Sequence, residues 1–498
     1  MTLADYPTKT GQWTLSIHRV TSSAVEIWAG TLFPTLKMPD VARVELEAPD
    51  GSLITREIRR ADWQRPFRFL NQRFYVLCRF DGLQPATRYK VRFWRRIEEV
   101  PGVLTESWQD LRSGTFDTLP TALPLLGQVP FTLGLASCFY NQRDGGQAAS
   151  AYLALYERGA EEVRPSITIL AGDQVYLDIG FDSLSLLAHE IRQRIAEDYA
   201  IHWQALGSIL TSGGTWCLPD DHEYWNDFPF YDSLIPALLS LKLSRVRRAW
   251  TQSARDGVEN IQRSPAIETF SIGSDLSFCM ADLRSYRSKN QFMRKEDFEH
   301  LCDWARNLQC PGVLAIPQLL VDEPDKHERN LLSFKDQYAR LLQALAHSGN
   351  DILVISGDVH YGRIASTRLG NKGARLIEVV SSPMSNLTGL NGIATAVPSR
   401  RPELFPDPKK IRIPGWDPAP VTYDPRFEVS SRPGRLFSAY PKDRTREHFM
   451  TLSFSRDPGG DIQVSVDAWR IRERDPQTNL PVRDFSEPFV TRLRRVSL

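Results

Sequence analysis

Four short segments of this chain carry side chains that can bind metal ions, and each segment contains a run of apolar residues. The segments are FTLGLASCFY, SITILAGDQVYLD, TWCLPDDHEYWND and DILVISGDVH. A short apolar run that ends in turn residues is typical of a buried strand. The candidate ligands at the four strand ends are Cys138, Asp173, Tyr176, Asp221, Asn226, Asp358 and His360. We therefore predict a metal centre built from strand ends.

The mixture of ligand types indicates more than one metal ion. Carboxylate oxygens bind calcium, magnesium or manganese, whereas a phenolate together with a thiolate favours iron. Asp173 and Asp358 are the candidates to bridge two ions, because one carboxylate can share its two oxygens. Two ions about 3.5–4 Å apart can activate a water and hold a phosphoryl oxygen, as hydrolysis of a phosphoester requires.

Each segment alone has a simpler explanation. Gly-Asp is a common turn pair, Cys138 could be a small buried residue, and Tyr176 could belong to the core. The acidic residues before His222 could cap a turn. All four segments in order, each with an apolar run, favour the metal centre. We expect Asp178 to cap a turn or to support a ligand.

Composition indicates a globular protein. The 498 residues include 61 basic and 60 acidic ones, a formal net charge of +1. This balance gives no reason to expect nucleic acid or an anionic membrane as the main partner. The six cysteines show no short framework spacing, so disulfides are not required and a reducing compartment is compatible.

The sequence shows no export or membrane signal. The first residues, MTLADYPTKTGQW, lack a basic region followed by an apolar one. No apolar run approaches the ~18 residues that a membrane-spanning helix needs. We therefore expect a cytoplasmic protein, with a removed signal as the alternative.

Residues 1–122 read as an N-terminal β-sandwich. Strict alternation places Trp13, Leu15 and Ile17 on one face of a strand. The stretch LQPATRYKV resembles the corner of a fibronectin type III domain, where a Tyr, here Tyr89, bonds back to the chain. We expect this domain to act as a scaffold, with docking of a substrate or partner as the alternative.

Residues 123–498 read as an α/β layered domain, because strands alternate with helical patterns. We expect helices at 146–163, 184–210, 233–255, 296–308 and 334–348. A proline-rich loop at 393–441 lacks periodicity. A segment of that length is either a functional loop over the surface or a mobile one.

Five motifs together resemble those of the PhoD-type alkaline phosphatases, the alkaline phosphatase D family. They are ASC at 136–138, GDQVYLD at 172–178, DDHE at 220–223, DLRSYR at 282–287 and SGDVHY at 356–361. That family belongs to the calcineurin-like metallophosphoesterase superfamily, and the resemblance covers roughly residues 10–480. Purple acid phosphatases also have a GDxxY segment, but Asp221-His222 replaces their Asn-His pair, which favours the PhoD resemblance.

The resemblance implies a four-layer α/β/β/α sandwich, preceded by the fibronectin type III-like sandwich, with iron and calcium at the strand ends. The ligands carried over for iron are Cys138, Asp173, Tyr176 and Asp358, and those for calcium are Asn226, Asp173, Asp358 and His360. Asp221 joins the metal ligands. The assignment of Asn226 as a ligand is based on its spacing after the DDHE motif. Manganese, zinc and magnesium are the alternative ions.

The resemblance also implies hydrolysis of small-molecule or lipid phosphoesters, as a phosphomonoesterase, a phosphodiesterase or both. A metal-activated hydroxide would attack phosphorus, and His222 would protonate or stabilise the leaving group. Arg284 and Arg287 would hold phosphate oxygens, with pairing to nearby acids as the alternative. Two further alternatives are a non-catalytic binding protein built on the sandwich and a hydrolase of another anionic ester. We expect no nucleic-acid binding.

Overall fold

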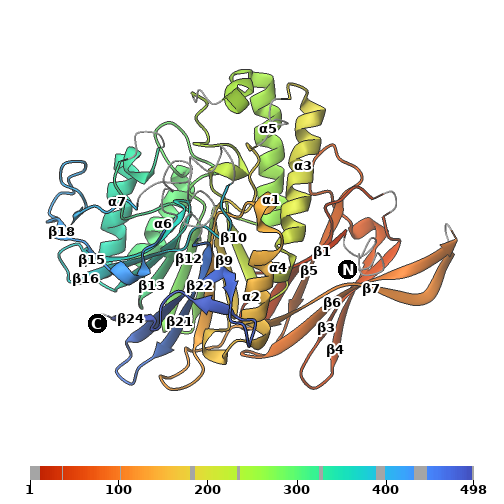
Figure 1. Cartoon of the computed structure of the whole chain (residues 1–498), viewed down its shortest axis with the longest axis horizontal. Coiled ribbons are helices and arrows are strands. Elements are labelled where there is room, and N and C mark those ends of the chain that lie inside the picture. Colours follow the sequence, from red (N-terminus) through yellow and green to blue (C-terminus); the bar gives the residue numbers. More distant parts are fainter. Residues whose placement is uncertain are drawn as a thin grey trace.

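Two large β-sheets organise this chain, and helices lie on their outer faces (Figure 1). The structure is a computed structural model that describes residues 12–35, 38–100, 103–179, 185–232, 236–324, 329–387, 399–430 and 446–495. Among these residues, none of the helices combines the length and the apolar character needed to cross a membrane.

The first sheet has the strand order β23-β22-β21-β8-β9-β10-β1-β2-β5 within the described residues, with β24 also paired to β22. β8, β9 and β10 are parallel neighbours at its centre. Its strands are β1 Trp13–His18, β2 Ala24–Thr31, β5 Phe74–Asp81, β8 Phe131–Ala136, β9 Ile167–Ala171, β10 Gly214–Leu218, β21 His448–Arg456, β22 Ile462–Arg474, β23 Pro481–Arg483 and β24 Phe489–Leu493.

The second sheet has the order β11-β12-β13-β14-β16-β15-β19 in the same described ranges, with β20 paired to β15. Its strands are β11 Ile267–Ile272, β12 Leu276–Ala281, β13 Gly312–Ala315, β14 Ile352–Ser356, β15 Tyr361–Leu369, β16 Ala374–Val380, β19 Thr422–Tyr423 and β20 Val429–Ser430. A small separate pair consists of β17 Leu404–Phe405 and β18 Ala419–Pro420.

Three hydrophobic clusters separate four layers. The cluster between the sheets contains inward side chains of both, such as Ile169 of β9 and Ile355 of β14. A second packs the outer face of the first sheet against α2, α3, α4 and α5, and a third packs α6 and α7 onto the second sheet. The predicted α/β/β/α sandwich is thereby confirmed. The helices are α1 Asn141–Asp144, α2 Gln147–Arg158, α3 Ala188–Ala205, α4 Gly207–Leu210, α5 Ser244–Gly257, α6 Lys295–Arg306 and α7 Lys335–His347.

The predicted N-terminal β-sandwich is also confirmed. The sheet β4-β3-β6-β7 faces β1, β2 and β5 across shared core residues such as Leu15 and Phe93. Its strands are β3 Val41–Glu47, β4 Leu53–Arg59, β6 Arg88–Val100 and β7 Val103–Asp117. The Tyr89 hydroxyl accepts the backbone N–H of Gln84 at 3.0 Å, the bond expected of the tyrosine corner.

The N-terminal sandwich and the four-layer α/β/β/α sandwich share a sheet. β1 lies beside β10 in parallel, with His18 opposite Thr215, so β1, β2 and β5 extend the sheet that carries β8 and β9. The domain boundary after residue 122 stays a prediction. Of the proline-rich loop, 399–430 is described, while 393–398 and 431–441 lie outside the described residues.

Candidate metal centre

The predicted ligands come from the ends of strands in both sheets. Cys138 follows β8, Asp173 follows β9 and Asp221 follows β10, and these parallel strands end at one edge. Asp358 and His360 follow β14 of the opposite sheet. The structure thus brings the four sequence segments together.

A glycine lets the two sheets meet at this edge. A Cβ at Gly357 would collide with the side chain of Ser137 and with the carbonyl oxygen of Ala171. Gly357 N–H also donates to Pro317 O at 3.1 Å. The end of β14 can therefore lie directly against the ends of β8 and β9, which places Asp358 beside Cys138.

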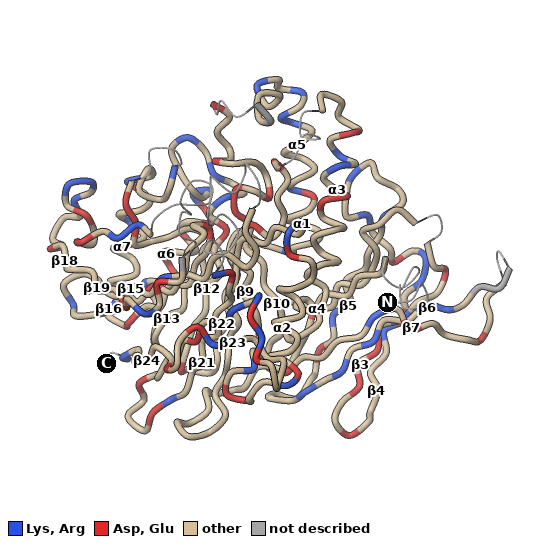
Figure 2. Tube along the Cα trace, viewed as in Figure 1, with Lys and Arg blue, Asp and Glu red and all other residues tan. Residues whose placement is uncertain are grey.

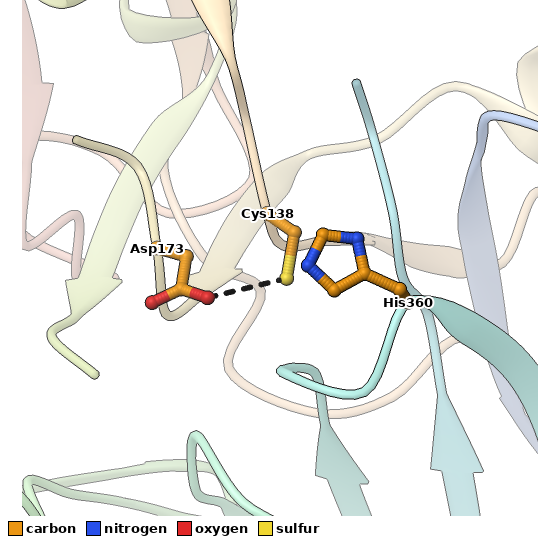
Figure 3. Close-up of side chains that lie close together, drawn as sticks. All are labelled: Cys138, Asp173 and His360. Carbon is orange, nitrogen blue, oxygen red and sulfur yellow. Dashed lines mark hydrogen bonds between the residues drawn. The ribbon is translucent and has the colours of Figure 1, made fainter. Parts of the chain in front are cut away.

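One group of ligands surrounds the thiol of Cys138 (Figure 3). Its Sγ lies 3.5 Å from Asp173 Oδ2, and it also contacts the carbonyl oxygen of Asp358 at 3.2 Å. His360 reaches the same point, and its Nε2 lies 3.4 Å from the hydroxyl of Tyr176. Thiol, carboxylate, imidazole and phenol therefore converge.

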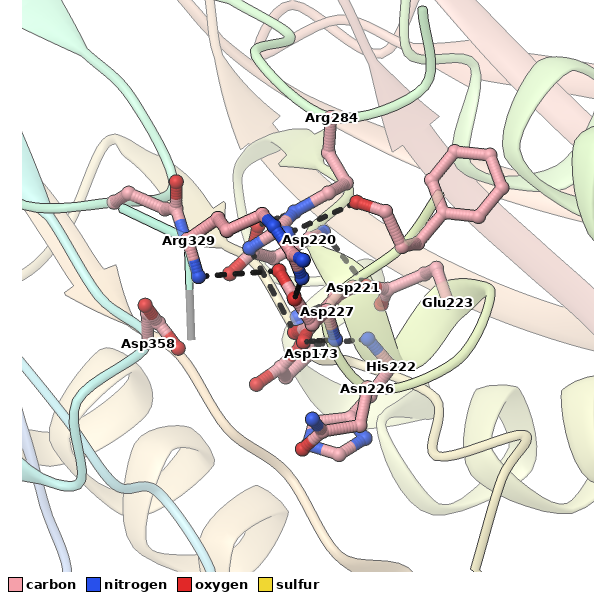
Figure 4. Close-up of polar contacts among 12 residues, drawn as sticks. Asp173, Asp220, Asp221, His222, Glu223, Asn226, Asp227, Arg284, Arg329 and Asp358 are labelled. Carbon is pink, nitrogen blue, oxygen red and sulfur yellow. Dashed lines mark hydrogen bonds and ion pairs between the residues drawn. The ribbon is translucent and has the colours of Figure 1, made fainter. Parts of the chain in front are cut away.

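Two further groups continue from the first, the second sharing Asp173 with it and the third sharing Asp221 with the second (Figure 4). Asp173, Asp221 and His222 bring one ligand atom each within 4.8 Å of one another, and so do Asp220, Asp221 and Asp358. Asp173 belongs to two groups and Asp221 to two. Shared carboxylates are what a site for neighbouring ions requires.

The backbone at the ligands is strained. Cys138, Asp173, Asp358 and His360 have φ values of 55°, 58°, 70° and 54°, in the left-handed region that non-glycine residues rarely adopt. Such conformations cost on the order of 1–3 kcal/mol each and persist where the surroundings determine them. Here the Cys138 N–H donates to Gly172 O and that of His360 to Ser382 Oγ. The strained residues are all candidate ligands, and three of them, Cys138, Asp173 and His360, form one group.

Asp178 orients His222. Its Oδ1 lies 2.7 Å from His222 Nδ1, and its Oδ2 accepts the Asn226 N–H at 2.8 Å. Burial opposes a charge on His222, but the carboxylates of Asp178 and Asp221 outweigh burial and raise the pKa of this imidazole to about 10. Asp178 therefore supports a candidate ligand or acid, as expected. Asn226 lies beside His222 in Figure 4.

Glu223 holds the loop that carries Asp173, a role the sequence reasoning missed. This buried carboxylate accepts the backbone N–H groups of Asp173, Gln174, Val175 and Asp220 at 2.6–3.1 Å. It also accepts from Gln262 Nε2 at 3.1 Å. The sequence feature that could have identified Glu223 is its position as the last residue of the DDHE motif.

Asn386 and Glu447 support His360 and were also missed. Asn386 Oδ1 lies 3.1 Å from His360 Nδ1, and Glu447 Oε1 accepts the Asn386 N–H at 2.8 Å. Arg143 and Arg472 form ion pairs with the buried Glu447. The tautomer that donates from Nδ1 to this oxygen leaves the lone pair of Nε2 for a metal. No sequence motif marks these residues.

Arg284 and Arg287 are buried and engaged by protein groups. Arg284 Nε donates to Asp220 Oδ1 at 2.6 Å, and its Nη1 donates to Phe228 O at 3.2 Å. Arg287 binds the carbonyl oxygens of Leu283 and Arg329 and the side chain of Gln318. These bonds hold both guanidinium groups in place, and their role toward a phosphate stays a prediction.

The electrostatics of the site fit bound cations. Burial, together with the charges of Asp221 and Asp220, raises the pKa of Asp173 well above its usual range. Burial likewise raises the pKa values of the Cys138 thiol and the Tyr176 phenol. Within the described residues, the buried Asp220 Oδ2 has no hydrogen-bond partner. A cation would favour the charged form of each group.

Comparison with solved structures confirms the resemblance in fold. A structure of PhoD superposes with a TM-score of 0.60 at 15% identity, covering 98% of this chain and 92% of that one. A purple acid phosphatase from yellow lupin (Lupinus luteus) seeds gives a TM-score of 0.53 at 11% identity, covering 96% and 73%. No protein-family model matches the sequence, and neither does any curated protein.

Proposed function

We propose that this chain hydrolyses phosphoesters with the help of bound metal ions. The observation that carries the proposal is the set of three overlapping ligand groups linked through Asp173 and Asp221. The fold shared with PhoD and a purple acid phosphatase supports it. The proposal includes monoesters and diesters of small molecules or lipids.

Iron is proposed for the group around Cys138, because a thiolate and a phenolate suit a trivalent ion. Its proposed ligands are Cys138, Asp173, Tyr176 and Asp358, and His360 also approaches this group. Calcium is proposed for the oxygen-rich side, with Asn226, Asp173, Asp358 and His360, and with Asp221 as a further oxygen ligand. When bound, the ions would supply an activated water and neutralise charge on the phosphoryl oxygens.

His222 is proposed as the acid for the leaving group. Asp178 accepts from Nδ1 and fixes the plane of the ring, which leaves Nε2 to hold the proton that passes to the leaving oxygen. Arg284 stays a candidate for a phosphate oxygen, and its ion pair with Asp220 would limit the repulsion between buried carboxylates. Arg287 stays a candidate in the same role.

The test compares Asp173→Asn with a matched control, Asp336→Asn, an exposed residue of α7. Metal content is measured on the purified proteins, and hydrolysis is followed with p-nitrophenyl phosphate and bis-p-nitrophenyl phosphate. A visible charge-transfer band would report a phenolate bound to iron.

We expect the native chain and the control to contain metal and to hydrolyse at least one ester. Asp173→Asn should lose metal and activity together while remaining folded. Full activity of Asp173→Asn at normal metal content would refute the assignment. The absence of metal and of turnover in the native chain would refute the function.

A further inference from the structure

Exposed leucines gather at the ends of two helices. Leu186 and Leu187 precede α3, Leu239 lies in the 3-10 turn η5 (Pro236–Lys242), and Leu243 precedes α5. Their side chains are between 44% and 51% exposed. Single exposed leucines are ordinary on a protein surface, but a group of them indicates an interaction site.

These leucines lie at one end of the molecule because α3 and α5 run in the same direction. Arg194 of α3 stacks on Trp250 of α5 at 4.4 Å, and Tyr199, farther along α3, packs on Gly257 at the far end of α5. Figure 1 shows the two helices side by side. Both helix starts, with their leucines, therefore project together.

Basic side chains surround these leucines. Lys242, Arg245 and Arg248 are exposed. Figure 2 shows the basic residues gathered at the top of α5. Arg247 stacks on the ring of Tyr231 at 3.9 Å.

Two acidic residues lie close to these side chains in the sequence, and each makes a contact of its own. Glu190 accepts from Ser185 Oγ at 2.5 Å, and Asp232 pairs with Arg329 at 2.7 Å. We call Leu186, Leu187, Leu239, Lys242, Leu243, Arg245 and Arg248 the docking patch. It combines exposed apolar and exposed cationic side chains.

The docking patch is on the side of the molecule that holds the metal centre. A helix that follows a parallel strand begins at the carboxyl edge of that strand, and α3 and α5 follow β9 and β10. Trp250 Nε1 of α5 also donates to Tyr224 O at 2.6 Å, three residues after Asp221. α5, whose first turn carries part of the patch, therefore contacts the segment that carries candidate metal ligands.

We infer that the docking patch binds an anionic lipid bilayer. Cations attract the negative headgroups, and apolar side chains beside them enter the interface between headgroups and acyl chains. A nucleic acid would use the cations but leave the leucines in water, because its backbone is charged and polar. The inference stands without the hydrolysis proposed above.

The experiment measures binding of the full chain to phosphatidylcholine vesicles with and without phosphatidylglycerol, at low and high salt. One variant removes the charges, Lys242→Gln/Arg245→Gln/Arg248→Gln, and a second removes the leucines, Leu239→Ser/Leu243→Ser. The matched control is Leu53→Ser/Ile54→Ser/Arg56→Gln, exposed residues of β4 in the N-terminal sandwich. Thermal unfolding midpoints verify that each variant is folded.

We expect salt-sensitive binding to the phosphatidylglycerol vesicles. At low ionic strength, loss of the three charges should lower the partition coefficient on the order of 100-fold. Loss of the two leucines should lower it about tenfold. The control should bind like the native chain.

Several results would overturn the inference. They are no binding to either vesicle, equal binding to neutral vesicles, or patch variants that bind as tightly as the native chain. Binding to duplex DNA or RNA without binding to vesicles would assign the patch to nucleic acid instead.

Discussion

Asp178 Oδ1 lies 2.7 Å from Nδ1 of His222, and this contact sets the direction of the imidazole. The carboxylate is buried, and its second oxygen is held by the Asn226 N–H. It therefore cannot turn away without losing two bonds. A ring fixed in this manner presents Nε2 to the reacting groups, whether or not Nε2 is protonated.

The first prediction concerns the leaving group. His222→Ala should lower kcat about 100- to 10,000-fold for an alkyl phosphoester, the range of general acid catalysis. For a p-nitrophenyl ester the loss should be much smaller, because p-nitrophenolate departs without a proton. Asp178→Asn should show the same pattern at lower magnitude. Equal losses for both esters would show that His222 is not the acid.

The second prediction concerns metal affinity. Asn386→Ala removes the acceptor that faces His360 Nδ1, so the ring loses its orientation. We expect metal affinity to fall about 10- to 100-fold, as for other residues that support a ligand. Equilibrium dialysis with metal analysis measures this, and Asn290→Ala, an exposed residue, is the control. Unchanged affinity in Asn386→Ala would contradict the role.

The third prediction concerns the contact between the sheets. Gly357→Ala places a methyl group against Ser137 and the Ala171 carbonyl, and overpacking of this kind costs about 1–3 kcal/mol. We expect a lower unfolding midpoint and a lower metal content. Gly207→Ala is the control, because no atom lies within 4 Å of its added Cβ and α4 is helical there. A normal midpoint and metal content in Gly357→Ala would contradict the prediction.

The fourth prediction concerns the N-terminal sandwich. Removal of residues 1–122 uncovers the edge of β10, which now pairs with β1. It also removes Thr115, which exchanges backbone hydrogen bonds with Thr211 and Gly213. An exposed strand edge is a site of aggregation, so we expect the fragment 123–498 to be aggregated in size-exclusion chromatography. A monomeric fragment with the full-length unfolding midpoint would instead support an independent domain.

Local patterns were enough to predict the strands that carry the candidate ligands. The apolar run before Gly172 predicted β9, and the run before Gly357 predicted β14. A strand that is buried on both faces needs apolar side chains at consecutive positions, so the pattern is visible in the sequence. The α/β/β/α architecture and the resemblance to PhoD, confirmed by the structure and the comparison, rested on the order of such segments. Asp173 was singled out on the same basis.

Contacts between distant segments were beyond these patterns. Glu447 lies 61 residues after Asn386 along the chain, yet it holds that residue against His360. Glu447 lies in no recognisable motif, so nothing in the sequence distinguishes it from the other acidic residues. Only the packing of β21 beside β8 brings Glu447 to the metal centre.

Sequence alone therefore identified candidate metal ligands and the strands that present them, because both depend on residue type and local periodicity. Tertiary structure decided how the two sheets meet at Gly357 and which residues support the ligands. It also gathered Leu243 and Arg245 with Leu187 into the docking patch, although the net charge of +1 gave no sign of a basic surface. Net charge sums over the chain, whereas an interface depends on which charges the fold places together.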